Sequence, residues 1–443
     1  MQGMDDGADT SHGPRYFGTR ADAIDAFGRH VSQAKVDFFR AVGMDVVFGR
    51  REGAFFWDVD GRRFLNLHCN GGVFNMGHRH PALVAALVEA LDYWDVGNHH
   101  LVSEARAAVA QRLAALLPGD LNRAVFAPGG GEAVDVAIKM ARAVTGRQGV
   151  VSAVGGYHGH TGLALATGDA KYLDPFGPRL PGFSQVVFGD LAALDAAIGD
   201  DCAAVVLEAV PATAGVVVPD PEYMRGVRRV CDERGVMFVL DEVQTGLGRT
   251  GRLFAAQHWD LVPDFLVLGK GLSGGLVPIA ATFYRDPYDS VFAPDPFVHV
   301  STFGGAETAC AVTLALVDLI TAPGFCERVE AAGARLQAGL EAVCAAHPDQ
   351  LDGVRRLGLM CGLLWRRPET GLLASKALFD HGAFAVYANN DKRVTQILPP
   401  LVATDAEIDL AVEIVEAAAT TLTSPEYAAL AEALAPALVD GGT

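Results

Sequence analysis

Short apolar runs alternate with amphipathic segments over most of the chain between residues 80 and 320. Five of these runs, each four or five residues long and ending at polar or turn-forming residues, are 123–127, 149–153, 203–207, 237–240 and 265–268. Runs of this length between turn signals are typical of buried strands. The segments between them place apolar residues at helical spacing, as at Val134, Ile138 and Ala141. This alternation predicts βαβ units and a mostly parallel sheet.

Two successive strands of this pattern end at charged residues. The run 237–240 stops at Asp241, and the run 265–268 stops at Gly269-Lys270-Gly271. A lone aspartate or lysine in such a place commonly caps a turn or lies in a solvated loop. Lys270, however, is one of six lysines in the chain, and it alone follows an apolar strand between two glycines. Because ligands of open α/β sheets bind beyond the carboxyl ends of the strands, we expect an acid and an amine to meet there.

These residue types indicate one kind of chemistry. A lysine that forms Schiff bases must lose its proton, and partial burial favours the neutral amine. Flanking glycines allow a flat ring to approach the backbone. An acid at the same edge would keep a pyridine nitrogen protonated and make the ring an electron sink. The combination indicates pyridoxal phosphate (PLP) as the cofactor.

The segment 241–271 resembles class III PLP-dependent aminotransferases, also called the ω-aminotransferase group, which have fold type I. The residues that carry the resemblance are Asp241-Glu242-Val243-Gln244-Thr245-Gly246, Gly248-Arg249-Thr250-Gly251 and Gly269-Lys270-Gly271. The resemblance extends over roughly residues 20–422. It implies that Lys270 forms the Schiff base and that Asp241 pairs with the pyridine nitrogen. It also implies that Val243 packs on one ring face and that Gln244 lies near the phenolic oxygen.

Phosphate binding is implied at two glycine-containing segments. Gly129-Gly130-Gly131-Glu132 stands where the family has Ser-Gly-Thr/Ser-Glu, so both hydroxyl side chains are missing. Binding would then depend on the backbone amides of Gly130 and Gly131 at a helix N-terminus. The second segment, Ser301-Thr302-Phe303-Gly304-Gly305, is similar to a loop that lends its threonine to the partner subunit's phosphate. Thr302 therefore implies a homodimer with shared active sites.

Two further segments are expected near the cofactor. Tyr157-His158-Gly159 is similar to the family's aromatic-His-Gly triplet, which implies that Tyr157 covers the ring face opposite Val243. Without the resemblance, the local sequence explains Tyr157 equally well as an ordinary aromatic residue in a loop. Glu208 ends the strand 203–207 and corresponds to the glutamate of a Glu-Pro motif, with Ala209 in place of the proline. Without the resemblance, Glu208 would be read as a turn cap.

The expected substrate site departs from the family pattern. Many members that handle α-amino acids have an arginine three residues before a Pro-Pro-Leu run, where it binds the substrate carboxylate through a bidentate pair. This chain has Gln396 before Pro399-Pro400-Leu401. Either another arginine substitutes, Arg393 being the nearest in sequence, or the preferred substrate has no carboxylate at that point.

The expected fold is α/β, with a large domain built on a mostly parallel, seven-stranded-type sheet and a small discontinuous α+β domain. We predict a disordered N-terminus over 1–13, an N-terminal segment of the small domain over 14–75 and a large PLP-binding domain over 76–322. Residues 323–443 are predicted to form the C-terminal part of the small domain, with an additional helix over 424–440.

Composition narrows the functional class. Half of the residues are hydrophobic and 20% are charged, as in globular enzymes, and the formal net charge of −18 argues against a nucleic-acid surface. Seven scattered cysteines without C-x-x-C spacing indicate reduced thiols. The sequence has no secretory pattern and no apolar run of membrane-spanning length, so a cytoplasmic protein is expected. His78 and His80 have no third ligand at suitable spacing, so no metal site is expected.

Together these observations predict an aminotransferase. It would move an amino group between an amine or amino acid donor and an aldehyde or ketone acceptor, with small molecules rather than nucleic acids or membranes as its partners. Gln396 suggests a substrate without a nearby α-carboxylate. The alternative is another PLP reaction on the same fold: a lyase, racemase or aminomutase.

Overall fold

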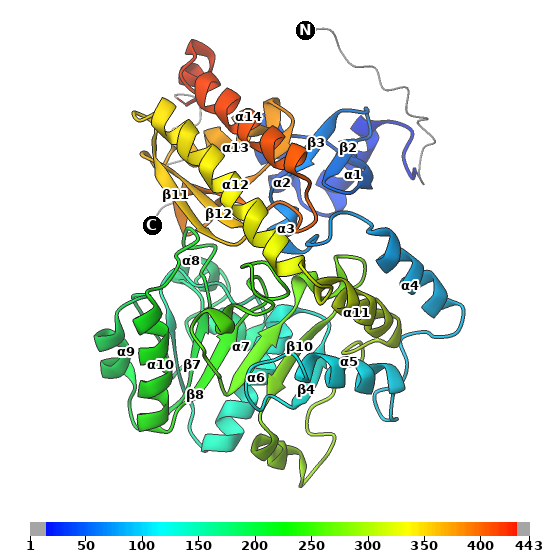
Figure 1. The fold of residues 1–443 in the computed structure, drawn as a ribbon, viewed down its shortest axis with the longest axis vertical. Helices are drawn as coiled ribbons and strands as arrows, with labels where there is room; N and C mark the ends of the chain where they lie inside the picture. The colour runs from blue at the N-terminus through cyan, green and yellow to red at the C-terminus, as the bar shows by residue number, and fades with distance from the viewer. Residues whose placement is uncertain (1–14, 432–443) are drawn as a thin grey trace.

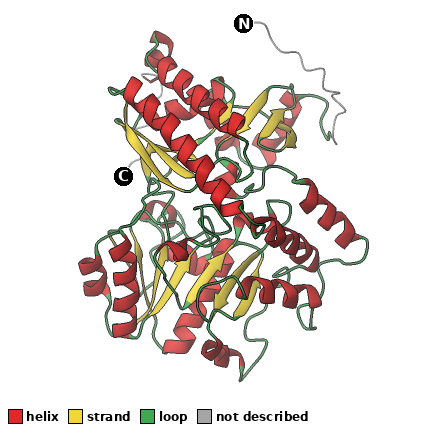
Figure 2. Cartoon of the chain, in the orientation of Figure 1, coloured by secondary structure: helices red, strands yellow, loops and turns green. Residues whose placement is uncertain are grey.

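The computed structural model describes residues 15–431, and its largest sheet has seven strands (Figures 1 and 2). In spatial order these are β4 (Arg123–Ala127), β10 (Ala280–Tyr284), β9 (Phe265–Leu268), β8 (Met237–Asp241), β7 (Cys202–Glu208), β5 (Gly149–Ala153) and β6 (Phe183–Val186). Strand β10 runs antiparallel to both of its neighbours, and the other pairs are parallel. The predicted α/β class and mostly parallel sheet are confirmed.

The strand register brings the predicted acid and amine to one edge. Glu208, the last residue of β7, pairs with Asp241, the last residue of β8, and Asp241 pairs with Val267 of β9. Lys270 follows shortly after Val267, just beyond the end of β9. The carboxyl ends of three adjacent strands thus present two carboxylates and one amine side by side.

Helices cover both faces of this sheet because its strands are apolar on both sides. Every residue of β7 is buried. Ala204 and Val206 pack in the cluster that contains α6 (Gly130–Thr145), whereas Val205 and Leu207 pack in the cluster that contains α10 (Pro221–Arg234). This alternation follows from the two-residue period of a strand.

Local sequence signals determine where α10 begins and ends. The side chain of Asp220 accepts a hydrogen bond from the backbone N–H of Glu222, Pro221 occupies the first turn, and Gly235 ends the helix with a φ of 60°. All three signals are visible in the sequence, because they are the usual residues for a helix N-cap, a first turn and a left-handed C-cap.

Two four-stranded sheets accompany the large one. The first has the order β1 (Phe48–Glu52), β2 (Phe55–Asp58), β3 (Arg63–Asn66) and β13 (Ala383–Phe384). The second has the order β11 (Leu351–Leu357), β12 (Met360–Trp365), β15 (Asp391–Ile397) and β14 (Val386–Ala388). Because β13 pairs in parallel with β3, residues from the two ends of the chain share one sheet. In Figure 1 they lie together above the large sheet.

The remaining helices surround these sheets. They are α1 (Arg20–His30), α2 (Gln33–Ala41), α3 (Cys69–Gly72), α4 (Pro81–Leu91), α5 (Glu104–Ala114), α7 (Gly162–Ala166), α8 (Ala170–Leu173), α9 (Leu191–Ala197), α11 (Glu307–Ile320), α12 (Phe325–Ala346), α13 (Thr370–Asp380) and α14 (Asp405–Thr421). Figure 1 shows α12 running from the part of the molecule that holds the large sheet into the part that holds the two smaller sheets.

Two sequence expectations fall partly or wholly outside the described residues. The segment predicted to be disordered, 1–13, lies outside them, as do Leu434 and Leu438 of the predicted terminal helix. Within the described part, Tyr427 is 5% exposed, and its hydroxyl donates to Asp380 Oδ2 at 2.6 Å. The start of the C-terminal segment therefore packs on the chain's own surface.

Neither a membrane span nor a metal cluster is evident over residues 15–431. No single helix there has the length and apolar composition needed to cross a bilayer; α11 and α12 would pass together, but they are bent by 72° where they meet. Within the same range, no group of three or more His, Cys, Asp and Glu side chains could hold a metal ion.

Candidate active site

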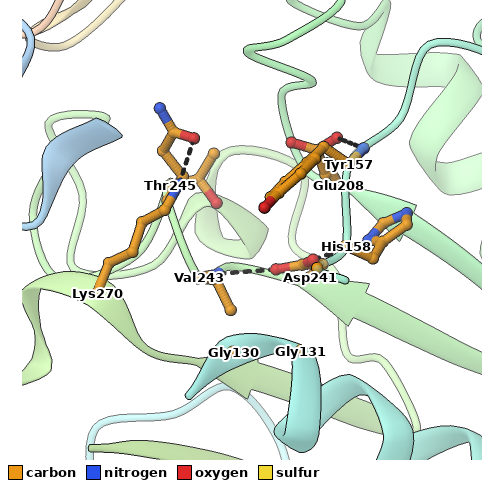
Figure 3. A pocket seen from close by; sticks show the side chains of 11 residues that line it. Gly130, Gly131, Tyr157, His158, Glu208, Asp241, Val243, Thr245 and Lys270 are labelled. Carbon is orange, nitrogen blue, oxygen red and sulfur yellow. Dashed lines mark hydrogen bonds and ion pairs between the residues drawn. The ribbon is translucent and has the colours of Figure 1, made fainter. Parts of the chain in front are cut away.

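The candidate active site is a pocket at the carboxyl edge of the large sheet, where the ends of β7, β8 and β9 approach the first turn of α6 (Figure 3). The pocket is lined by Gly130, Gly131, Tyr157, His158, Gly159, Glu208, Asp241, Val243, Gln244, Thr245 and Lys270. All of these except Gly159 and Thr245 were predicted from the sequence. In Figure 3, Val243 lies between Lys270 and Asp241, and the Gly130–Gly131 turn lies below them.

Asp241 is held by two hydrogen bonds at the end of β8. Its Oδ1 accepts from the backbone N–H of Val243 at 2.9 Å, and its Oδ2 lies 2.7 Å from Nδ1 of His158. Both side chains are almost completely buried, at 4% and 1% exposure. Burial by itself would lower the pKa of His158, but the hydrogen bond and negative charge of Asp241 outweigh burial and raise that pKa. A carboxylate fixed in this way is suited to hold a cationic ring nitrogen.

Lys270 enters the pocket from a strained backbone position. Its φ is +44°, a left-handed value that side chains rarely adopt and that is typical of functional sites. Its Nζ donates to Oε1 of Gln244 at 2.6 Å. Burial lowers the pKa of Lys270 to about 8, against the opposing negative charges of Glu208 and Asp241. A substantial fraction of the amine is therefore neutral at physiological pH, as Schiff-base chemistry requires.

Glu208 connects the end of β7 to the loop that carries Tyr157. Its Oε1 accepts from the backbone N–H of Tyr157 at 2.8 Å. Burial raises the pKa of Glu208 to about 7; the charge of His158 opposes this rise, and that of Asp241 adds to it. Glu208 thus positions the aromatic loop, and its charge is sensitive to pH near neutrality.

The glycine turn at the start of α6 leaves room that a side chain would fill. A Cβ on Gly130 would lie 3.0 Å from Cγ1 of Val243, and one on Gly131 would lie 3.0 Å from Oγ1 of Thr161. Both distances are tighter than ordinary van der Waals contact. Gly129, the N-cap residue, supplies no side-chain hydrogen bond. Because the first N–H groups of a helix have no partner within the helix, this turn offers bare backbone donors to an anion.

The residues present fit PLP. Asp241 provides an acceptor for a protonated ring nitrogen, and the Gly130–Gly131 turn provides donors for a phosphate. Nε2 of Gln244 is buried and has no hydrogen-bond partner among residues 15–431, which suits a residue expected near the phenolic oxygen. Tyr157 and Val243 both line the pocket, as expected of side chains that cover a flat ring. The individual cofactor contacts stay predictions.

Sequence reasoning missed two residues beside the reacting amine. A Cβ on Gly71 would lie 3.3 Å from Nζ of Lys270, and the backbone N–H of Gly71 donates to Nδ1 of His68 at 3.3 Å. Burial, helped by the charge of Lys270, lowers the pKa of His68 to about 4. Asn70 and Gly71 are left-handed, with φ values of 53° and 66°. The Asn-Gly-Gly run was a usable signal for such a backbone, but nothing in the sequence located it next to Lys270.

Three predicted residues do not line this pocket. Thr302 is exposed, as its predicted place in the partner's site would require. Gln396 is buried in β15, with 5% exposure. Arg393 is directed to Asp391 by two hydrogen bonds, Nε to Oδ1 at 3.0 Å and Nη2 to Oδ2 at 2.9 Å. The substrate roles of Gln396 and Arg393 and the partner role of Thr302 stay predictions.

Sequence comparison matches residues 40–419 to the family model described as aminotransferase class-III. An uncharacterized aminotransferase of Archaeoglobus fulgidus is 50% identical over 390 residues, which cover 88% of this chain and 92% of the relative. A putrescine aminotransferase of Pectobacterium atrosepticum is 37% identical over 357 residues, which cover 78% of this chain and 76% of that protein.

Structure comparison agrees with the sequence matches. The crystal structure of ornithine aminotransferase from Toxoplasma gondii superimposes with a TM-score of 0.84 and 27% identity, covering 92% of this chain and 96% of that one. A second structure of that enzyme, with a TM-score of 0.80 and 27% identity over 91% and 98% of the two chains, has PLP at partial occupancy in its active site.

Proposed function

The chain belongs to the class III aminotransferase family, and on that premise we propose that one of its substrates is an amine, or the corresponding aldehyde or ketone, whose carboxylate is distant or absent. The family membership makes the protein a PLP-dependent aminotransferase. The substrate proposal is carried by Gln396, which stands where many members have a carboxylate-binding arginine. A neutral amide supplies no charge for a bidentate pair with a carboxylate.

Three further observations support this substrate class. No arginine is among the residues that line the pocket in the described part of the chain. Arg393, the other arginine considered, is already engaged with Asp391. One relative, 37% identical, is named a putrescine aminotransferase, and putrescine is a diamine without a carboxylate.

Four residues of the chain have separate roles in the proposed reaction. When bound, PLP supplies an electron sink that stabilises negative charge on the substrate's amine-bearing carbon. Asp241 keeps the ring nitrogen protonated, and His158 holds Asp241 in position. The amine of Lys270 would carry a proton from the amine-bearing carbon of the donor to the cofactor, so that the donor leaves as an aldehyde or ketone. Gln244 orients that amine through the 2.6 Å hydrogen bond to Nζ.

We also propose that the enzyme acts as a homodimer in which Thr302 completes the partner's phosphate site. Thr302 lies in the loop 297–303, which exposes the large apolar side chains of Phe297, Val298 and Phe303, and the loop 93–102 exposes those of Tyr93, Leu101 and Val102. The rings of His100 and Phe297 lie 5.1 Å apart, so the loops 93–102 and 297–303 are neighbours. Exposed apolar side chains on two neighbouring loops are consistent with a subunit interface.

The substrate proposal is tested by adding amines to the purified PLP enzyme and following the visible spectrum and the consumption of a keto acceptor. We expect primary amines and diamines without an α-carboxylate to bleach the cofactor band and to consume the acceptor in stoichiometric amounts. Lyase, racemase or aminomutase chemistry would leave the acceptor unconsumed. The Lys270→Ala variant serves as the inactive reference.

Substitution at position 396 separates charge from other effects. Gln396→Arg should increase the response to α-amino acid donors and decrease the response to diamines, because the guanidinium attracts a carboxylate and repels an ammonium group. Gln396→Leu, which removes the amide without adding charge, should not produce this exchange. Unchanged activity of Gln396→Arg towards every donor would refute the substrate proposal.

A further inference from the structure

Asn390 lies in the turn between β14 and β15, and it makes three hydrogen bonds to the part of the chain that holds the large sheet. Its backbone N–H donates to the carbonyl oxygen of Thr213 at 2.9 Å. Its Nδ2 donates to the carbonyl oxygen of Gly155 at 2.6 Å, and its Oδ1 accepts from the hydroxyl of Tyr172 at 3.1 Å. The amide orientation is determined by its partners, because a carbonyl oxygen only accepts.

The two residues that the Asn390 side chain hydrogen-bonds, Gly155 and Tyr172, both lie next to Tyr157. Gly155 precedes Tyr157 by two residues and has a φ of +78°. Tyr172 packs edge-on against Tyr157, with ring centroids 6.2 Å apart, and His160 lies 5.2 Å from each of these two rings. One amide group therefore fixes the start of the aromatic loop and, through Tyr172, supports the ring of Tyr157.

We propose that Asn390 is a positioning residue through which the β14–β15 turn sets the orientation of Tyr157 over the cofactor. Glu208 already holds the backbone N–H of Tyr157 from the end of β7. Asn390 adds a second restraint from a different sheet, so the ring position depends on how that sheet docks against the large one. Aromatic stacking is sensitive to ring offset, so a small shift of the loop weakens the contact with a flat ligand.

The carbonyl oxygen of Gly155 accepts a second hydrogen bond, so the restraint on the loop can be removed one bond at a time. Oγ1 of Thr213 also donates to it, at 3.2 Å. In Asn390→Ala that bond remains, so the loop keeps part of its restraint. In Asn390→Asp a carboxylate oxygen faces the Gly155 carbonyl oxygen, and the two acceptors repel each other. Aspartate should therefore perturb the loop more than alanine does, although it is closer to asparagine in shape.

The experiment uses holoenzyme and two readouts that need no turnover: the visible circular dichroism of bound PLP and the rate of PLP release into a phosphatase trap. We expect Asn390→Ala to lower the dichroic signal and to speed release about five- to tenfold, because the neutral side-chain hydrogen bonds to Gly155 and Tyr172 are both lost. Asn390→Asp should speed release more than about tenfold. The double variant that combines Asn390→Ala with Thr213→Val should exceed the product of the single effects, because both donors share one acceptor.

Asn389→Ala is the matched control. Asn389 occupies the same turn and is exposed, and it is its backbone carbonyl oxygen, not its side chain, that accepts from Lys171 at 2.6 Å. This variant should behave as wild type in both readouts. Wild-type dichroism and release in both Asn390 variants, or an equal change in Asn389→Ala, would overturn the proposal. The readouts need only bound PLP, so a different substrate class would leave them unchanged.

Discussion

Lys270 and Glu208 influence one another's charge. Burial lowers the pKa of Lys270 to about 8, and the negative charge of Glu208 is the largest of the effects that oppose it. Burial raises the pKa of Glu208 to about 7, so above that pH Glu208 is mostly ionised. At the residue scale, the pKa of the nucleophile therefore depends on the charge of a neighbouring acid.

The pH dependence of PLP capture by the apoenzyme should show this adjustment. The neutral amine is the nucleophile, so the capture rate should rise with pH, reach half of its maximum near pH 8 and level off above it. An amine with the ordinary lysine pKa of 10.5 would have its midpoint far higher. Stopped-flow absorbance from about pH 6 to about pH 11 gives the profile, because this range includes both the lowered and the ordinary lysine pKa.

Removing the charge of Glu208 should move that midpoint to lower pH. The negative charge raises the pKa of Lys270, so Glu208→Gln should lower the pKa further. Glu104→Gln, an exposed substitution on α5, is the control and should leave the midpoint unchanged. A shift to higher pH in Glu208→Gln would contradict the assigned interaction.

At the scale of single elements, the pocket depends on the first turn of α6. Gly131 packs against the neighbouring loop 159–161: a Cβ there would lie 3.0 Å from Oγ1 of Thr161 and 3.4 Å from Cα of Gly159. The helix as a whole would tolerate alanine, which has a better helix propensity than glycine. The requirement for glycine therefore comes from the close approach of the 159–161 loop to the turn.

Gly131→Ala should consequently weaken PLP binding without unfolding the apoenzyme. Overpacking of about 1–3 kcal/mol would displace Thr161 and disturb the backbone donors of the turn. A fluorescence titration of apoenzyme with PLP measures the loss, which should be about tenfold or more. Gly162→Ala, where a Cβ would meet nothing within 4 Å, is the matched control. Equal affinities in the two variants would show that the turn does not contact the phosphate.

At the scale of the whole molecule, Arg249 joins the large sheet's loops to the C-terminal part of the chain. It is 1% exposed, and its Nη1 donates to the carbonyl oxygens of Leu359 at 3.0 Å and Pro399 at 2.6 Å. Burial lowers the pKa of Arg249 to about 10, against the opposing influence of the Cys69 and Cys361 thiols. The guanidinium thus holds two segments together through backbone carbonyls.

Arg249→Lys should destabilise the protein more than Arg249→Met does. Lysine keeps a buried positive charge, but its shorter side chain does not reach the position from which Nη1 of Arg249 donates to both carbonyl oxygens. We therefore expect a loss of about 2–4 kcal/mol in urea unfolding. Methionine also removes the buried charge, which offsets part of the lost hydrogen bonding. Arg252→Lys, an exposed neighbour, should change stability little. A larger loss for Arg249→Met would refute this account.

The proposed dimer has its own test. Sedimentation analysis should give a mass of two chains, and Thr302→Ala should release PLP faster without changing that mass, because the proposal places the hydroxyl at the partner's phosphate site. Ser301→Ala, in the same loop, is the control. A monomeric active enzyme, or a Thr302→Ala variant that retains PLP like wild type, would contradict the shared site.

Much of this organisation was predictable from local patterns. Apolar runs predicted β4, β5, β7, β8 and β9, and the strand-end residues Asp241, Glu208 and Lys270 followed from them. The resemblance then predicted Tyr157 and Gln244 as pocket residues, and both line the pocket. His68 and Gly71 were not predictable, since their proximity to Lys270 arises from a turn that is far from it along the chain.

The sequence by itself determined the chemistry, because an acid and an amine at the ends of adjacent parallel strands meet whenever those strands form one sheet. It also determined the element boundaries that depend on local signals, such as Asp220 and Gly235 around α10. The tertiary structure decided which distant segments surround that chemistry: the left-handed turn at Gly71, the buried guanidinium of Arg249 and the Asn390 contact with Gly155. These depend on how three sheets dock, and docking is set by packing between residues far apart in the chain, which no local pattern encodes.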